Sequence, residues 1–462
     1  MSPTRTFAMV LALVAVGCGV AAFASPDQER VAADTNELDT PIWSPRRVPQ
    51  PLVDAVGAQR LQAELTAATA GLQTCFVVDE GGAPIAEQSA DVPLVPASTQ
   101  KLVTSAVALA VLGADTRLET RALAPAAPAD GSVERLFLVG GGDPLLMTPE
   151  AQAQREEIPE LRGSPTTSLA TLADSIVQAG VKRIPGGIVA DDSRYEDLRY
   201  LPTWKDSYRT EGQVGPLGAL TVNGGFDPLR PPEPVSDPAT FAARELERLL
   251  EDRGVSVGGS PERGTAPQGA VEVAKVQSPP MSDLVAEDLS TSDNLASELL
   301  LREVGLKVSQ QGTTAAGVQA ATATLAELGL PTTNVTLVDG SGLDRGNRST
   351  CDLLADTLDL GARPEFSTLW SGLAVAGEKG TLIDQIEGAL TGKVRAKTGS
   401  LDNTTGLVGI VDVGRPIRFA FLANGDFTEG AGIGLRGRIA EIISTFPNAP
   451  PADQLVPAPA GT

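Results

Sequence analysis

Residues 116–280 differ in character from the segments on either side of them, and this change constrains the fold more than any other feature. The stretch contains short strand-like runs at 135–139 and 187–190 and one clear helical pattern at 238–253. Glycine and proline interrupt it repeatedly, as in GGGDP, RPPEP and GGSPERG. We interpret it as an inserted region with a smaller core of its own, which divides the rest of the chain into two segments.

The two segments that flank the insertion, 52–115 and 281–446, contain longer elements. Apolar spacing predicts helices at 52–70, 281–306 and 432–446, and a buried helix that starts after Pro96 and runs to Leu112. β-Branched content and turn spacing predict strands at 74–78, 83–88, 394–398, 405–413 and 417–424. A proline-rich linker at 25–51 precedes these segments, and a disordered tail at 447–462 follows them.

Residues 1–24 are typical of an export signal. Arg5 supplies a positive charge, residues 7–23 are almost wholly apolar, and residues 22–24 offer an A-x-A cleavage site. The apolar run is also long enough to be an uncleaved membrane anchor, and Cys18 offers a weaker lipoprotein alternative. All three alternatives place the rest of the chain outside the cytoplasm.

The chain contains no histidine. This absence excludes Ser-His-Asp and Cys-His catalysis, and it excludes HExxH zinc sites and most other metal sites that use histidine. A hydrolase of this sequence would need Lys, Asp, Glu or Tyr as its base. We expect no metal and no other cofactor.

The net charge of −22, without a run of Lys or Arg, argues against binding to nucleic acid or to anionic lipid through charge. Of the three cysteines, Cys18 lies in the N-terminal apolar run, which leaves Cys75 and Cys351. These two are either a disulfide in an oxidising compartment or two buried thiols. Spacing alone cannot show that two residues are close, so buried thiols are the more ordinary expectation.

Three short motifs occur once each and in a fixed order. Ser98-x-x-Lys101 opens the helix that follows Pro96, SDN at 292–294 lies in a helix or the loop leading into it, and KTG at 397–399 lies on a predicted strand. Together they form the set typical of serine β-lactamases and penicillin-binding proteins.

The spacing of the first motif explains how a serine is activated without histidine. Residues i and i+3 of a helix share a face, so the Lys101 nitrogen can reach the Ser98 oxygen. Burial and a second positive charge from Lys397 favour the neutral amine of Lys101, which can then deprotonate Ser98. The N–H groups of Ser98 and Ser400 would form the oxyanion hole.

The other motif residues would bind substrate and move protons. Ser292 would pass a proton to the leaving amine, and Asn294 would hold a substrate amide and orient Lys101. Lys397 should stay charged and bind the terminal carboxylate, with a hydrogen bond added by Thr398. Gly399 would let the strand approach the substrate, which would lie beside it as an added edge strand.

Each motif by itself also has an ordinary structural explanation. Ser98 could be a helix N-cap, Lys101 a solvated lysine, and KTG the end of a strand. We favour catalysis because all three motifs occur in the required order and each lies on the element that the chemistry needs.

With these motifs the chain resembles the D-alanyl-D-alanine carboxypeptidases/endopeptidases of the penicillin-binding protein 4 type, peptidase family S13. The stretches VGGGDP, GALTVN, VDGSGL and GTL also resemble signatures of this family, and the resemblance covers about residues 72–446. It implies an α+β fold, with a transpeptidase-like domain in which helices cover both faces of an antiparallel sheet. That domain would consist of 52–115 plus 281–446, with one or more smaller lobes inserted at 116–280.

The resemblance also implies an activity, the cleavage of D-alanyl-D-alanine ends or cross-links of peptidoglycan stem peptides. The reaction would pass through an acyl-enzyme on the serine, and penicillins would acylate the same serine. The resemblance further implies a location in the bacterial cell envelope. In relatives an acidic residue of the insertion meets the amine of the substrate's diamino acid, and Asp191 and Asp192 are candidates here.

Two alternatives compete with this interpretation. A class A β-lactamase would need a Glu in an E-x-x-L-N setting, which the stretch 295–396 lacks. A non-catalytic wall-binding protein of the same fold would not be expected to keep all of its catalytic motifs intact.

Overall fold

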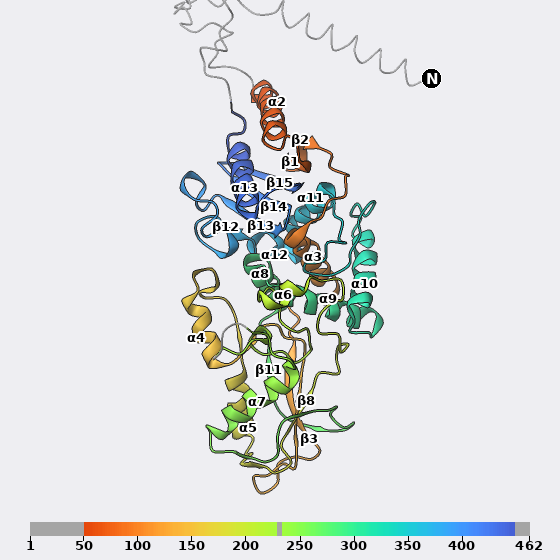
Figure 1. Cartoon of the computed structure of the whole chain (residues 1–462), viewed down its shortest axis with the longest axis vertical. Coiled ribbons are helices and arrows are strands. Elements are labelled where there is room, and N and C mark those ends of the chain that lie inside the picture. The colour runs from red at the N-terminus through yellow and green to blue at the C-terminus, as the bar shows by residue number, and fades with distance from the viewer. Residues whose placement is uncertain (1–49, 229–232, 449–462) are drawn as a thin grey trace, which may run out of the picture. The chain divides into compact units, whose positions relative to one another are not determined.

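The computed structural model describes residues 50–228 and 233–448 (Figure 1). The described residues from Asp54 onward belong to one compact unit. The predicted leader at 1–24, the linker as far as residue 49 and the tail from residue 449 lie outside the described residues. Among the described residues, no helix combines the length and the apolar character needed to cross a bilayer.

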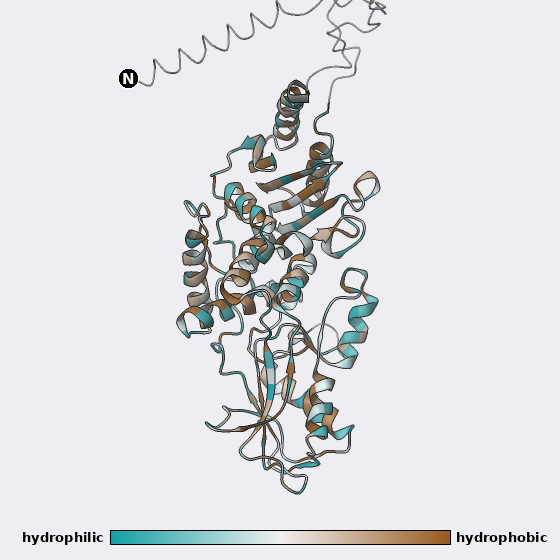
Figure 2. Cartoon of the chain, turned by 180° about the vertical axis from the view of Figure 1, so that it is seen from behind, coloured by the Kyte–Doolittle hydropathy of each residue, from teal (hydrophilic) through white to brown (hydrophobic). Residues whose placement is uncertain are grey.

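A six-stranded antiparallel sheet joins the two ends of the described chain (Figure 1). In spatial order its strands are β12 (Ala374–Val375), β13 (Val394–Leu401), β14 (Thr404–Asp412), β15 (Pro416–Asn424), β1 (Gln73–Glu80) and β2 (Ala83–Gln88). Strand β1 pairs with β15, which follows it by more than three hundred positions, so the segments before and after the insertion form one sheet. These strands are coloured largely hydrophobic in Figure 2, as expected for a sheet with both faces covered.

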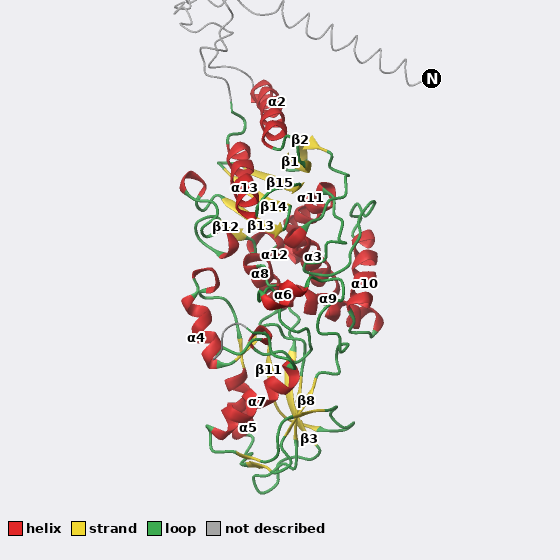
Figure 3. Cartoon of the chain, in the orientation of Figure 1, coloured by secondary structure: helices red, strands yellow, loops and turns green. Residues whose placement is uncertain are grey.

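Helices cover both faces of this sheet (Figure 3). The core on one face is shared with α3 (Gln100–Leu112), α8 (Met281–Thr291), α9 (Asn294–Ser309), α10 (Thr314–Glu327) and α11 (Cys351–Asp359). The other face packs on α2 (Gln50–Ala68) and α13 (Glu429–Ser444). Neighbouring strand residues point to opposite faces, so Val408 joins the first core and Leu407 joins the second. The α+β fold with helices on both faces of an antiparallel sheet is confirmed.

The insertion has a sheet and a core of its own. Its five strands, in spatial order, are β10 (Glu262–Arg263), β8 (Ile188–Asp191), β4 (Leu136–Val139), β3 (Glu119–Ala124) and β11 (Val271–Gln277). Helices α5 (Leu169–Gln178) and α7 (Pro238–Glu251) pack on it. We propose residues 116–280 as a separate lobe, and residues 52–115 plus 281–446 as the catalytic domain, because each of the two sheets takes its strands from only one of these parts.

Two of the signature stretches contact each other inside the insertion. The Gly142 N–H donates to the carbonyl of Ala219 at 2.8 Å. A Cβ at Gly140 would overlap that same carbonyl, and a Cβ at Gly141 would overlap the backbone of Glu119. Glycine is therefore needed here for close backbone packing, which gives VGGGDP and GALTVN a structural role.

The predicted helix at 281–306 is wrong in one respect, because it is two helices. Helix α8 ends at Thr291, Ser292 has a left-handed backbone with φ 64° and ψ 41°, and α9 starts at Asn294. The Asp293 side chain caps α9 by accepting a hydrogen bond from the Ala296 N–H at 3.1 Å. The break turns Ser292 out of helical geometry.

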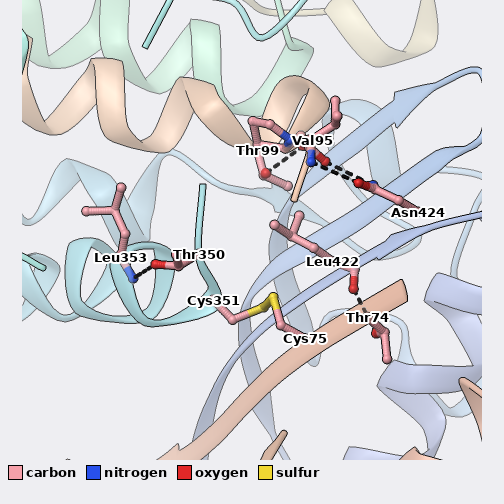
Figure 4. Close-up of a disulfide and its surroundings, with 10 residues drawn as sticks. Thr74, Cys75, Val95, Thr99, Thr350, Cys351, Leu353, Leu422 and Asn424 are labelled. Atoms are coloured by element: carbon pink, nitrogen blue, oxygen red, sulfur yellow. Dashed lines mark hydrogen bonds between the residues drawn. A yellow bond between two sulfur atoms is a disulfide. The ribbon is translucent and has the colours of Figure 1, made fainter. Parts of the chain in front are cut away.

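Cys75 and Cys351 form a disulfide, which decides between the two alternatives left open by the sequence and corrects the expectation of free thiols (Figure 4). Their Cα atoms lie 5.9 Å apart, within the normal range for a disulfide. The bond joins β1 to the first residue of α11, and both cysteines are fully buried.

Candidate active site

Ser98 lies in a single 3₁₀ turn, η2 (Ala97–Thr99), directly before α3. It is half-buried, whereas its neighbours Ala97 and Thr99 are fully buried. Ala97 has a positive φ of 49°, a conformation that costs a non-glycine residue about 1–3 kcal/mol. The turn is therefore held in a strained geometry by its surroundings.

Two glycines allow other segments to pack closely against this turn. A Cβ at Gly342 would overlap the carbonyl of Ala97. A Cβ at Gly399 would lie 2.8 Å from the Pro96 oxygen and 3.0 Å from Cγ2 of Thr99. We expected Gly399 to make room for substrate, but in this structure it makes room for the turn that carries Ser98.

Lys101 is fully buried, and its Nζ has three oxygen neighbours. It lies 3.0 Å from Ser98 Oγ, 2.7 Å from Asn294 Oδ1 and 2.7 Å from the Ser341 carbonyl oxygen. The Asn294 and Ser341 oxygens can only accept hydrogen bonds. A neutral amine would therefore direct its two N–H groups to them and its lone pair toward Ser98.

The contact with Ser341 depends on a buried carboxylate. Glu298 Oε1 accepts hydrogen bonds from the N–H groups of Gly340 at 3.0 Å and Ser341 at 2.7 Å. Thr104 also donates to the Gly340 carbonyl at 2.7 Å. The signature stretch VDGSGL is therefore a loop that is held in place and presents one carbonyl oxygen to Lys101.

Burial lowers the pKa of Lys101. Four acidic side chains oppose this effect and raise the pKa; in order of size they are Asp288, Asp339, Glu298 and Asp293. Burial also raises the pKa of Asp288 and of Glu298, which weakens their negative charge. The surroundings thus favour the neutral amine that the base mechanism needs.

Lys397 lies on β13 and is also fully buried. Its Nζ donates to Ser292 Oγ at 2.8 Å and to the Thr398 carbonyl at 3.1 Å. Burial, and then the charge of Lys101, hold its pKa well below the ordinary value. We expect Lys397 to keep its charge when substrate is bound; without substrate, burial lowers its pKa as it lowers that of Lys101. A substrate carboxylate would supply the missing negative charge.

Asn294 connects the catalytic domain to the insertion. Its Oδ1 accepts from Lys101, and its Nδ2 donates to the Gln213 carbonyl at 2.7 Å. The predicted orienting contact with Lys101 is therefore present. One of the two amide hydrogens is already engaged by Gln213, so the other is the one left for a substrate amide.

Two further residues adjoin the KTG strand, and sequence reasoning gave them no role. The first is Thr381 of the signature stretch GTL, whose Oγ1 lies 3.0 Å from Thr398 Oγ1. Arg436 of α13 donates through Nη1 to the Gly399 carbonyl and to Ser400 Oγ, each at 2.8 Å. The GTL stretch was a usable signal for Thr381, whereas no local pattern distinguished Arg436.

The insertion's two candidate acids have structural partners. Asp191 accepts hydrogen bonds from the N–H groups of Ser193 at 3.0 Å and Ala266 at 2.7 Å. Asp192 forms ion pairs with Arg199 at 2.6 Å and Arg263 at 2.9 Å. Both carboxylates are buried and bonded within the insertion, so neither is left to meet a substrate amine.

The eight predicted site residues thus lie on three adjoining segments. The turn before α3 and the first residues of α3 contribute Ser98 and Lys101, respectively. The junction of α8 and α9 contributes Ser292 and Asn294, and β13 contributes the rest, which are Lys397, Thr398, Gly399 and Ser400. Within the described ranges 50–228 and 233–448, no group of three or more acidic or cysteine side chains could hold a metal ion.

Several carboxypeptidases are similar in sequence to this chain. A carboxypeptidase from Mycobacterium tuberculosis is 32% identical over 350 residues, which cover 72% of each chain. A carboxypeptidase from Mycolicibacterium smegmatis is 30% identical over 418 residues, which cover 86% of this chain and 85% of the relative. A D-alanyl-D-alanine carboxypeptidase from an Actinomadura species is 29% identical over 398 residues, covering 69% of this chain and 71% of the relative.

Solved structures show the same fold. Penicillin-binding protein 4 from Haemophilus influenzae superposes with a TM-score of 0.69 at 22% identity, covering 84% of this chain and 98% of that one. The model of the D-Ala-D-Ala carboxypeptidase 3 (S13) family matches residues 54–230 and 228–444. The chain therefore belongs to the D-Ala-D-Ala carboxypeptidase 3 (S13) family.

Proposed function

We propose that the protein is a serine-type D-alanyl-D-alanine carboxypeptidase that cleaves peptidoglycan stem peptides through an acyl-enzyme on Ser98. One observation carries this proposal: Lys101 Nζ lies 3.0 Å from Ser98 Oγ while two acceptor-only oxygens occupy its other contacts. That geometry suits a neutral amine that accepts the serine proton. We propose that cross-links of the same D-alanyl chemistry are also cleaved.

In the acylation step, Ser98 Oγ attacks the carbonyl carbon of the penultimate D-alanine, and its proton passes to Lys101. The oxyanion would be held by the N–H groups of Ser98 and Ser400. Ser292, which accepts from Lys397 at 2.8 Å, would pass its hydroxyl proton to the leaving amine as the C–N bond breaks, and the proton held by Lys101 would replace it. Water then attacks the ester carbonyl while the neutral Lys101 takes a proton from it, and that proton returns to Ser98 Oγ as the ester bond breaks and the shortened peptide leaves.

The free edge of β13 supports binding of the peptide as an added strand. Strand β12 pairs only with Arg395 and Ala396 of β13, so along residues 397–401 that edge has no strand partner within the described part of the chain. An extended peptide would pair there through its main chain. Its terminal carboxylate would meet Lys397 and Thr398, the latter oriented by Thr381.

We propose the cell envelope as the location and β-lactams as covalent inhibitors. The disulfide supports an oxidising compartment, because cytosolic proteins rarely keep such bonds. One solved structure of Haemophilus influenzae penicillin-binding protein 4, with a TM-score of 0.62, is a complex with a β-lactam. The same chemistry at Ser98 would open a β-lactam ring and leave an ester.

Covalent labelling by a fluorescent penicillin tests the proposal. We expect one label per molecule in the wild type and none in Ser98→Ala, with an unchanged circular dichroism spectrum. Ser105→Ala is a control, because Ser105 lies on α3, which directly follows the turn that carries Ser98, and is fully buried. Normal labelling of Ser98→Ala would show that another residue is the nucleophile.

The lifetime of the label separates the alternatives. A β-lactamase would lose the label within seconds and accumulate hydrolysed penicillin, whereas a carboxypeptidase would hold it for much longer. A non-catalytic wall-binding protein would acquire no label at all. Release of D-alanine from a synthetic pentapeptide would then establish the substrate.

A further inference from the structure

Arg436 places a buried cation directly behind the KTG strand. It lies on α13, and only 2% of its surface is exposed. Its guanidinium donates to the Gly399 carbonyl at 2.8 Å, to Ser400 Oγ at 2.8 Å and to Gln385 Oε1 at 2.9 Å. All three acceptors are neutral, and within the described ranges no carboxylate forms an ion pair with Arg436.

The Gly399 carbonyl and the Ser400 N–H are the two ends of one planar peptide group. A charge-assisted hydrogen bond to the oxygen draws electron density away from the nitrogen, so the N–H becomes a stronger donor. In the proposed mechanism this N–H is one of the two groups that hold the oxyanion. A cation on one end of the peptide therefore acts on the reacting oxygen at the other end.

The same peptide is fixed from its other side. An added Cβ at Gly399 would lie 3.1 Å from the Thr99 nitrogen, so the strand already presses against the turn that carries Ser98. Arg436 also holds the Ser400 side chain through the nitrogen that binds Gly399. The peptide lies between the guanidinium and the nucleophile's own turn and has little freedom to rotate.

We propose that Arg436 is a positioning residue of the oxyanion hole: it orients the Gly399–Ser400 peptide and polarises its N–H toward the tetrahedral intermediate. This inference rests on the proposed acyl-enzyme function. Burying a cation whose hydrogen-bond acceptors are all neutral is costly, and an uncharged side chain could fill the same space at a lower cost. Burial lowers the pKa of Arg436 to about 10, so the side chain remains charged at neutral pH.

The test compares Arg436→Lys, Arg436→Gln and Arg436→Met with the wild type. For each variant we would measure the rate of acylation by penicillin and the affinity for a boronic acid, whose tetrahedral adduct mimics the intermediate. We expect Arg436→Gln and Arg436→Met to lower both the acylation rate and the boronic-acid affinity by about tenfold. This is less than the roughly 10²–10³-fold loss of rate that follows when an oxyanion-hole donor is removed outright. Lys should retain most of the activity, because it keeps the charge.

Two controls separate this role from a purely structural one. In a Ser98→Ala background, each variant should bind an uncleaved pentapeptide within about twofold of the parent, because the effect is confined to the transition state. Arg302→Met is the matched variant: Arg302 is fully buried and donates to the Leu198 carbonyl at 2.8 Å, but it does not contact the Gly399–Ser400 peptide. It should lower the melting temperature without a selective loss of acylation.

A folded Arg436→Met variant that acylates at the wild-type rate would overturn the inference. So would an equal loss of pentapeptide affinity and acylation rate. If Arg436→Met does not fold, the acylation rates of Arg436→Gln and Arg436→Lys are compared instead. Equal rates for these two variants would contradict polarisation by the charge. Failure of the wild type itself to be labelled would refute the proposed function instead.

Discussion

Replacing the two active-site lysines by arginine should have very different consequences. Lys101→Arg should reduce acylation by penicillin by about 10³-fold, within the 10²–10⁴-fold that general bases contribute. Arginine cannot release its proton, so no lone pair would face Ser98. Lys397→Arg should retain measurable acylation, with a loss on the order of 10- to 100-fold, because a guanidinium can still hold a carboxylate in altered geometry.

The structure also predicts a pH dependence. Lys101 must be neutral to act, and burial lowers its pKa from the usual 10.5. As the pH falls below the lowered pKa, the protonated fraction grows and the wild-type acylation rate should drop about tenfold per pH unit. The acidic side chains that raise the pKa of Lys101, of which Asp288 acts most strongly, set the pH at which the acylation rate begins to decline.

Stopped-flow acylation by a reporter penicillin, from about pH 4 to pH 9, measures both effects. Circular dichroism and melting temperature must show that each variant is folded, because a guanidinium is larger than the amine it replaces and overpacking costs about 1–3 kcal/mol. Near wild-type acylation by Lys101→Arg would refute the base assignment. A wild-type rate that stays flat down to about pH 4 would refute it as well.

Three further predictions concern stability and metal dependence. Replacing Cys75 and Cys351 by alanine should lower the free energy of unfolding by about 2–5 kcal/mol in a urea titration, because the bond spans 276 positions; an unchanged midpoint would contradict this. Burial raises the pKa of Asp143 from 3.8 to about 6, so the folded state favours the protonated acid. The stability that the protonated acid contributes is fully present below pH 4 and is lost as the pH rises through 6. Asp143→Asn should abolish this pH-dependent loss of unfolding free energy, which is about 3 kcal/mol at pH 7. If the melting temperature of the variant depends on pH in the same way as that of the wild type, the prediction is wrong. EDTA should leave penicillin labelling unchanged, and a loss that zinc restores would overturn the metal-free mechanism.

Much of the site could be predicted from the sequence because the relevant chemistry is local. Ser98 and Lys101 are three positions apart on one helical face, and SDN and KTG are short contiguous motifs on predictable elements. The strands predicted in the catalytic segments lie within a few residues of those in the structure, since period-2 patterns reflect burial of one face, whereas helix α10 (Thr314–Glu327) was not predicted. Composition alone restricted the possible base to Lys, Asp, Glu or Tyr, because the chain has no histidine.

Tertiary structure decided what depends on residues far apart in the chain. The Cys75–Cys351 bond, the Ser341 carbonyl on Lys101 and the Arg436 guanidinium on the Gly399–Ser400 peptide join positions that no local pattern relates. The relative charge states of the two lysines also depended on structure, because a pKa is set by burial and by every neighbouring charge in space. Sequence patterns therefore selected the candidate reacting groups, whereas the packing of distant segments determined how these groups are oriented and charged.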